Sequence, residues 1–124
     1  MSEDLTTELM DILGEDGFFT LTESYAGVRL YVPGDPARSE LPAIIGHDNA
    51  IRLSNVFPGS YVRVPLARTF RAMRYRDAGL TNREIARRLG LAENGVEKLF
   101  IRVKKRRPEL ARRTGDDRQT DLFK

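Results

Sequence analysis

The chain contains no cysteine among its 124 residues, which excludes disulfide bonds and zinc sites built from thiolates. It also lacks any apolar run close to the roughly 18 residues that a bilayer span requires. The first residues, Met1–Asp4, are acidic and do not form the apolar stretch of a signal peptide. We therefore expect a cytoplasmic protein that makes no contact with a membrane.

Residues that carry catalytic chemistry are equally scarce. His47 is the only histidine, and its neighbours Gly46 and Asp48 favour a structural role over a catalytic one. The sequence has no phosphate-binding loop, no nucleophile motif and no cluster of metal ligands. We therefore predict that the protein is not an enzyme and requires neither a metal nor another cofactor.

Charge is abundant but unevenly distributed, although the formal net charge is only +3. Residues 1–62 carry ten acidic and three basic groups, whereas residues 63–113 carry sixteen basic and five acidic groups. A basic excess of this size attracts polyanions, and DNA binds more tightly when Lys and Arg displace the counterions from its phosphates. Double-stranded DNA is thus the expected partner, and a basic surface that is merely solvated is the alternative.

The acidic half predicts short helices and two short strands. Gly14 follows a helical stripe of apolar residues and suits a helix C-terminus; the stripe consists of Leu5, Leu9, Ile12 and Leu13. Thr20 and Glu23 have the spacing of a capping box, which predicts that a second helix begins there. A third helix is expected behind Asp48 as its cap.

Two segments that lie 32 residues apart repeat one pattern. In 21–33 and in 53–65, a helical stretch is followed by a glycine, a β-prone segment and a proline. A loop is expected over 34–42. Because two strands of about five residues do not form a stable sheet alone, we predict a homodimer whose chains pool their strands and helices. An acidic subdomain that stays monomeric is the alternative.

The basic half predicts three helices. The first begins after Pro65 and ends at Gly79, and its predicted inner stripe consists of Leu66, Phe70 and Met73. The second extends over 82–89, behind a full capping box of Thr81 and Glu84. The third extends over 93–105 and follows Gly90, with an inner face of Val96, Leu99, Phe100 and Val103.

The spacing in the last two helices is typical of a helix-turn-helix. Ala86 is small enough for two helices to cross closely, Gly90 accepts the positive φ of a tight turn, and Val96 fills the angle between the helices. The remaining core positions hold Ile85, Leu89 and Leu99. A three-helix bundle that docks to proteins has the same spacing and is the alternative.

In a helix-turn-helix the second helix enters the major groove, where its outer side chains face the base edges. The predicted base-reading residues are Asn94, Glu97, Lys98 and Ile101. Asn94 suits adenine, Lys98 suits guanine and Glu97 suits the amino group of cytosine, although Glu97 could instead point to solvent. The predicted phosphate contacts are Arg83, Arg87, Arg88, Arg102, Lys104, Lys105, Arg106 and Arg107, which give affinity but little sequence information.

These observations predict a mainly α fold with two short β-strands. Residues 1–62 form an acidic dimerisation region of helices and strands, 63–107 a helix-turn-helix DNA-binding domain, and 108–124 a polar tail. Over roughly residues 20–105 the chain resembles the Mor/C transcription activators of Mu-like phages and prophages. The resemblance rests on Leu30-Tyr31-Val32-Pro33 after Gly27, on the second unit from Gly59 to Pro65, and on the helix-turn-helix that follows.

The resemblance implies an intertwined homodimer with two DNA-reading modules on an imperfect dyad site. It also implies that transcription is activated through contact with host RNA polymerase. The chain departs from the family where Ala26-Gly27 and Pro58-Gly59 replace a Gly-Gly pair, and where Ala92 replaces the Ser or Thr before the recognition helix. The alternative function is a helix-turn-helix adaptor or repressor-like phage protein that acts through protein partners.

Overall fold

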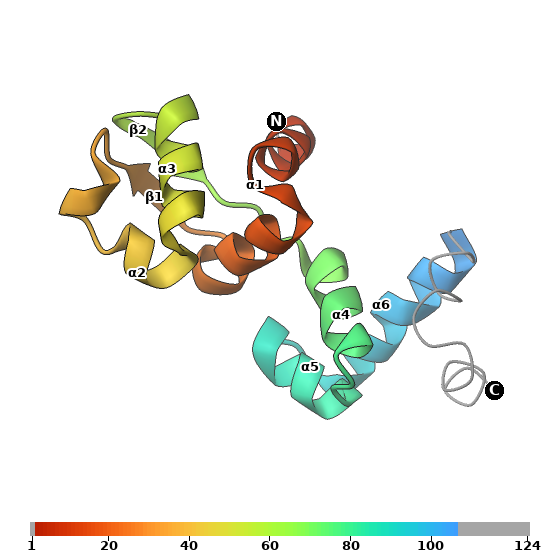
Figure 1. The fold of residues 1–124 in the computed structure, drawn as a ribbon. Coiled ribbons are helices and arrows are strands. Elements are labelled where there is room, and N and C mark those ends of the chain that lie inside the picture. The colour runs from red at the N-terminus through yellow and green to blue at the C-terminus, as the bar shows by residue number, and fades with distance from the viewer. Residues whose placement is uncertain (1, 107–124) are drawn as a thin grey trace. The chain divides into compact units, whose positions relative to one another are not determined.

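The computed structural model describes residues 2–106, and it describes side chains from Leu5 onward. The chain divides into two compact units, Met1–Ala67 and Arg68–Lys124, called unit 1 and unit 2 below. The described part is mainly helical and contains a two-stranded antiparallel sheet, which confirms the predicted mixture of elements (Figure 1). The predicted domain boundary after residue 62 falls inside a strand, whereas the two units divide after Ala67.

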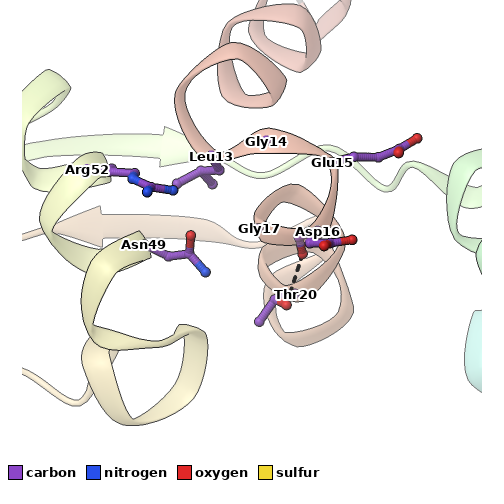
Figure 2. A pocket seen from close by; sticks show the side chains of 8 residues that line it. All are labelled: Leu13, Gly14, Glu15, Asp16, Gly17, Thr20, Asn49 and Arg52. Atoms are coloured by element: carbon purple, nitrogen blue, oxygen red, sulfur yellow. Dashed lines mark hydrogen bonds between the residues drawn. The ribbon is translucent and has the colours of Figure 1, made fainter.

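Unit 1 begins with α1 (Ser2–Tyr25), which Gly14 interrupts with non-helical angles of φ 77° and ψ 171°. This positive φ explains why the first apolar stripe ends at a glycine. Figure 2 shows the break, and the second helical segment follows it directly. The predicted helix start at Thr20 is therefore wrong. Thr20 lies inside the segment, where its hydroxyl donates a hydrogen bond to the carbonyl of Asp16 (3.1 Å) rather than capping a terminus.

The predicted loop over 34–42 contains a 3-10 turn, η1 (Pro36–Arg38), and the start of a short helix, α2 (Leu41–Ile45). No helix was predicted at α2, because Pro42 suggests a break in the chain. Proline is nevertheless tolerated in the first turn of a helix, where its missing N–H has no intrahelical partner to lose.

The next helix, α3 (His47–Val56), follows Gly46, whose φ is 99°. Asp48 therefore stands in the first turn of α3 and does not occupy the predicted cap position. A carboxylate in a first turn still favours the helix, because it interacts with the positive end of the helix dipole.

The two strands, β1 (Arg29–Val32) and β2 (Ser60–Arg63), pair antiparallel with each other within one chain. Val32 and Val62 are buried on the inner face of this sheet. Tyr31 and Tyr61 lie opposite each other on the exposed face, with ring centroids 5.2 Å apart. The prediction of a homodimer assumed that strands from two chains are pooled, whereas the structure pairs both strands of one chain.

The described part of unit 2 contains α4 (Arg68–Asp77), α5 (Asn82–Leu89) and α6 (Glu93–Arg106), and each of these helices contacts the other two. The bounds predicted for α5 are confirmed, and α6 extends one residue beyond its predicted end. No helix in the described part of the chain has the combination of length and hydropathy that crossing a bilayer requires.

The inner stripe predicted for α4 is wrong. Leu66 precedes the helix and is 46% exposed, while Phe70 and Met73 are only half-buried. The buried face is instead rotated toward Arg71, Ala72, Tyr75 and Arg76. Arginine stems and a tyrosine ring pack like apolar side chains, so counting only aliphatic and phenylalanine positions misplaced this face.

Candidate nucleic-acid interface

The start of α5 is fixed by a reciprocal capping box. The Thr81 hydroxyl accepts a hydrogen bond from the backbone N–H of Glu84 (3.2 Å), and the Glu84 carboxylate accepts one from the backbone N–H of Thr81 (2.8 Å). Hydrogen bonds from the Thr81 backbone and then from its hydroxyl lower the pKa of Glu84, and the positive charges of Arg88 and Arg87 lower it further. Glu84 is therefore held as a carboxylate at the positive end of α5.

A three-residue turn over 90–92 joins α5 to α6. Gly90 has left-handed angles (φ 71°, ψ 33°), which glycine adopts without steric cost. The N–H groups of Gly90 and Leu91 both donate to the carbonyl of Ala86, which ends α5 abruptly. The carbonyl of Ala92 then accepts hydrogen bonds from the N–H groups of Gly95 and Val96 and so begins α6.

The residues predicted as a helix-turn-helix core lie in the interior of unit 2. Five of them are buried, namely Ile85, Ala86, Leu89, Val96 and Leu99, and Gly90 forms the turn. Phe100 and Val103 extend the buried stripe along α6. This stripe fixes the rotation of α6 about its axis and therefore determines which of its side chains are exposed.

Two buried arginines, which belong to the basic excess predicted to attract DNA, connect the helices of unit 2. Arg71 donates through Nη2 to the carbonyl of Arg88 (3.1 Å), in the last turn of α5. Arg76 donates through Nη2 to Oδ1 of Asn82 (2.6 Å), and its guanidinium carbon lies 3.8 Å from the centroid of the Phe100 ring. Both side chains are buried, so they are not available to a ligand, and their hydrogen bonds connect α4 with α5.

The side of α6 opposite its buried stripe is exposed and carries all four predicted base-reading residues. Asn94, Lys98 and Ile101 follow one another at helical spacing along the centre of this face, and Glu97 flanks it. Ile101 is 54% exposed. Lys105 continues the same row toward the end of α6. The face therefore presents an amide, an ammonium group and an aliphatic side chain to one ligand surface.

The cations predicted to contact phosphates are also exposed within the described residues, namely Arg83, Arg87, Arg88, Arg102, Lys104, Lys105 and Arg106. Arg107 and the predicted tail over 108–124 lie outside the described residues. The guanidinium carbon of Arg88 lies 5.4 Å from the centroid of the Tyr75 ring, so its stem follows the surface of unit 2. The cations in the last turn of α6 also complement the negative end of that helix.

The burial of two arginines reduces, but does not abolish, the positive surface of unit 2. Residues 68–106 contain twelve basic and four acidic residues. Because only Arg71 and Arg76 among the basic residues are buried, ten cations remain at least partly exposed against four exposed carboxylates. An excess of this kind favours a polyanionic ligand.

A pocket of about 420 Å³ opens in unit 1 beside the break in α1, as Figure 2 shows. It is lined by Leu13, Gly14, Glu15, Asp16, Gly17, Thr20, Asn49 and Arg52. Its two carboxylates and its guanidinium belong to exposed side chains. The described residues also contain no group of three His, Asp or Glu side chains that could hold a metal ion. We therefore place the candidate site on α6 rather than in this pocket.

Comparison of the chain with protein-family models, curated proteins and solved structures finds no match. The resemblance to Mor/C activators consequently rests on the sequence motifs alone. The features of the structure that bear on function are the exposed face of α6 and the cations around it.

Proposed function

We propose that the protein is a sequence-specific DNA-binding regulator of transcription, in which α5 and α6 form a helix-turn-helix and α6 reads the major groove. The observation that carries this proposal is the exposed row of Asn94, Lys98 and Ile101, opposite the buried stripe of a helix that follows a tight glycine turn. In a helix-turn-helix, the N-terminal residues of the second helix contact base edges. Asn94 and Lys98 lie in the first two turns of α6.

The chemistry of this row fits the pattern of groups in the major groove. Asn94 offers a donor and an acceptor side by side, which suits the N6 and N7 positions of adenine. Lys98 donates to the acceptors of guanine, and Ile101 suits the methyl group of thymine. The carboxylate of Glu97 is repelled by phosphates unless it accepts a hydrogen bond from the amino group of cytosine, so it penalises other bases at that position.

The exposed cations of unit 2 supply the part of the affinity that does not depend on sequence. Arg83 and Arg87 lie on α5, whereas Arg102 and Arg106 lie on α6. In a helix-turn-helix the first helix crosses the DNA backbone while the second occupies the groove. Cations on both helices thus suit phosphates on either side of the groove, where they fix register and orientation.

Activation of transcription, rather than repression, is supported by the resemblance to Mor/C activators. Contact with host RNA polymerase is part of that proposal. The exposed face of α6 does not bear on the choice between activation and repression. A protein-docking adaptor is the second candidate function, and the exposed Ile101 is the single feature of α6 that favours it.

The full chain, mixed with a random pool of duplexes, tests the proposal. We expect bound duplexes to share a sequence, and we expect the logarithm of their affinity to fall linearly with the logarithm of salt concentration. Replacing Arg87→Ala or Arg106→Ala should weaken binding to all duplexes and flatten the salt slope by about one unit per lost phosphate contact. Affinity that is independent of salt would instead favour the adaptor, and a bound pool without a shared sequence would show that the protein binds DNA without reading bases.

A further inference from the structure

Unit 1 contains two copies of one series of elements. The copies, 9–33 and 41–65, are offset by the same 32 residues as the sequence repeat, but they begin twelve residues earlier than the pattern recognised in the sequence. Each copy has a glycine with positive φ between its two helical segments, at Gly14 (77°) and Gly46 (99°). Each has a second such glycine before its strand, at Gly27 (78°) and Gly59 (70°).

The buried side chains of unit 1 repeat at the same offset. The equivalent pairs that are buried in both copies are Leu9 and Leu41, Leu13 and Ile45, Phe18 and Ala50, Leu21 and Leu53, Thr22 and Ser54, and Val32 and Val64. Among the side chains that the structure describes in unit 1, the remaining buried apolar one is Val62, which is equivalent to the half-buried Leu30. The core is thus built from equivalent positions of the two copies.

The two copies are related by an approximate two-fold rotation. Leu30 pairs with Val62 across the antiparallel sheet, and these residues are each other's equivalents. The N–H of Gly27 donates to the carbonyl of Val64, and the N–H of Gly59 donates to the carbonyl of Val32, both at 2.8 Å. Exchange of the copies converts the first hydrogen bond into the second, as in an isologous contact of a symmetric dimer.

The contact between α1 and α3 also joins equivalent positions of the two copies. Gly17 and Asn49 are equivalent positions, and a Cβ atom on Gly17 would lie only 2.7 Å from Oδ1 of Asn49. Figure 2 shows the Asn49 side chain directed toward Gly17. Two equivalent positions that touch each other lie beside the rotation axis, as Leu30 and Val62 do.

We infer that unit 1 is a dimerisation module closed within one chain, in which the second copy takes the place that a partner chain holds in a symmetric homodimer. Within the described residues, the second copy continues into α4–α6, whereas the first continues into the loop before α2. One chain therefore offers one α6. In so far as the proposed function holds, the protein reads a single DNA site without dyad symmetry, and it does so as a monomer.

The exposed face of the sheet supports a monomer. Arg29 and Arg63 lie opposite each other beside the Tyr31–Tyr61 pair, and the guanidinium carbon of Arg29 lies 4.2 Å from the centroid of the Tyr61 ring. Two copies of this face placed against each other would bring four arginines together. Like charges in an interface oppose association.

The first experiment tests closure within the chain. Light scattering of the full chain should give the monomer mass of 14.1 kDa from low to high micromolar concentration. The double substitution Arg29→Cys and Arg63→Cys introduces cysteines into a cysteine-free chain at directly opposed, exposed positions. Dilute oxidation should give an intrachain disulfide, with Arg63→Cys alone as the control for random cross-linking. A dimer mass overturns the inference. So does a larger amount of disulfide-linked dimer from the double variant than from Arg63→Cys alone.

The second experiment tests the single DNA site. Duplexes selected from a random pool should share one sequence without an inverted repeat, and titration should saturate at one chain per duplex. An inverted repeat that is filled by two chains overturns the monomeric reading of DNA. If no duplex is retained, the proposed function fails together with the single-site claim, while mass and cross-linking still decide whether unit 1 is closed.

Discussion

Unit 1 buries hydroxyl groups where unit 2 buries guanidinium groups. In unit 1, the Ser54 hydroxyl donates to the carbonyl of Pro33 (2.9 Å) and the Thr22 hydroxyl donates to the carbonyl of Phe19 (3.1 Å). In unit 2, Arg71 and Arg76 extend from α4 to groups on α5. The Ser54 hydroxyl thus joins α3 to the segment after β1, and the Thr22 hydroxyl bonds within α1, whereas each buried arginine of unit 2 connects two helices.

The two units also differ in charge and in the way their charged side chains are buried. Unit 1 is acidic and its core is divided between two similar copies. Unit 2 is basic, and its described arginines comprise a buried pair, the half-buried Arg74 and an exposed set. We therefore expect buried arginines on α4 to stabilise unit 2, and exposed arginines on the neighbouring α5 to contribute to binding instead. Substitutions in the core of unit 1 test whether its copies are equivalent, and substitutions of arginine in unit 2 test whether burial decides the role.

Equivalent core positions of unit 1 should contribute similar amounts to the free energy of unfolding. Leu21→Ala and Leu53→Ala each remove a fully buried side chain, because both leucines are 0% exposed. Each substitution should lower the free energy of unfolding by about 2–5 kcal/mol. Urea unfolding followed by circular dichroism provides the measurement. A large loss at one position together with a negligible loss at the other would contradict the symmetric core.

Buried and exposed arginines of unit 2 should respond in opposite ways. Arg76→Ala removes the hydrogen bond to Asn82 and the contact with Phe100, so it should lower the free energy of unfolding by roughly 2–4 kcal/mol. Arg83→Ala removes an exposed cation on α5 and should change stability by less than about 0.5 kcal/mol while weakening binding to every duplex. Equal stability for the two variants would show that Arg76 does not hold unit 2 together.

Glu97 should act by excluding wrong sequences. Glu97→Ala removes an exposed anion from the face that we propose meets DNA, so binding to unrelated duplexes should become tighter and the preference at one base pair should weaken. The expected change is about 1 kcal/mol, at the lower end of the range for one base contact. Fluorescence anisotropy with selected and shuffled duplexes measures both effects. Unchanged affinity for both duplexes would place Glu97 outside the groove.

The smallest expected effect concerns the acid stability of unit 2. The folded-state pKa of Glu84 lies below its ordinary value of 4.5, so its contribution is present above that pH and is lost as the pH falls through the folded pKa. Glu84→Gln keeps an acceptor for the Thr81 N–H but does not titrate. Melting temperatures measured from roughly pH 7 to pH 3 should therefore fall less steeply for the variant than for the original chain. Parallel curves would show that Glu84 does not contribute to acid sensitivity.

The elements that the sequence predicted best are those fixed by neighbouring residues. The capping box of Thr81 and Glu84 and the turn at Gly90 depend on contacts within a few residues, so the start and end of α5 could be located from spacing alone. The inner face of α6 followed in the same way from its helical period. For these reasons the exposed candidate site on α6 could also be located from the sequence.

The features that were missed depend on distant contacts. The burial of Arg71 and Arg76 depends on partners on α5 and α6, although their spacing with Ala72 and Tyr75 along one helical face was a usable indication. The pairing of β1 with β2 depends on a register that no local pattern specifies. The repeat was recognised only from residue 21 onward, because similarity of Leu9 to Leu41 becomes informative only when both are known to be buried.

The central claim is that the outer face of α6 reads bases. The most direct test is the ratio of affinities for the selected and the shuffled duplex at one salt concentration, for the original chain, for Lys98→Ala and for Arg83→Ala. Lys98→Ala should lower this ratio roughly 5- to 150-fold, because it removes a base contact. This change corresponds to a loss of about 1–3 kcal/mol of discrimination. Arg83→Ala should weaken both affinities and leave the ratio unchanged, because a phosphate contact carries no sequence information. If Lys98→Ala also leaves the ratio unchanged, this face of α6 does not read DNA.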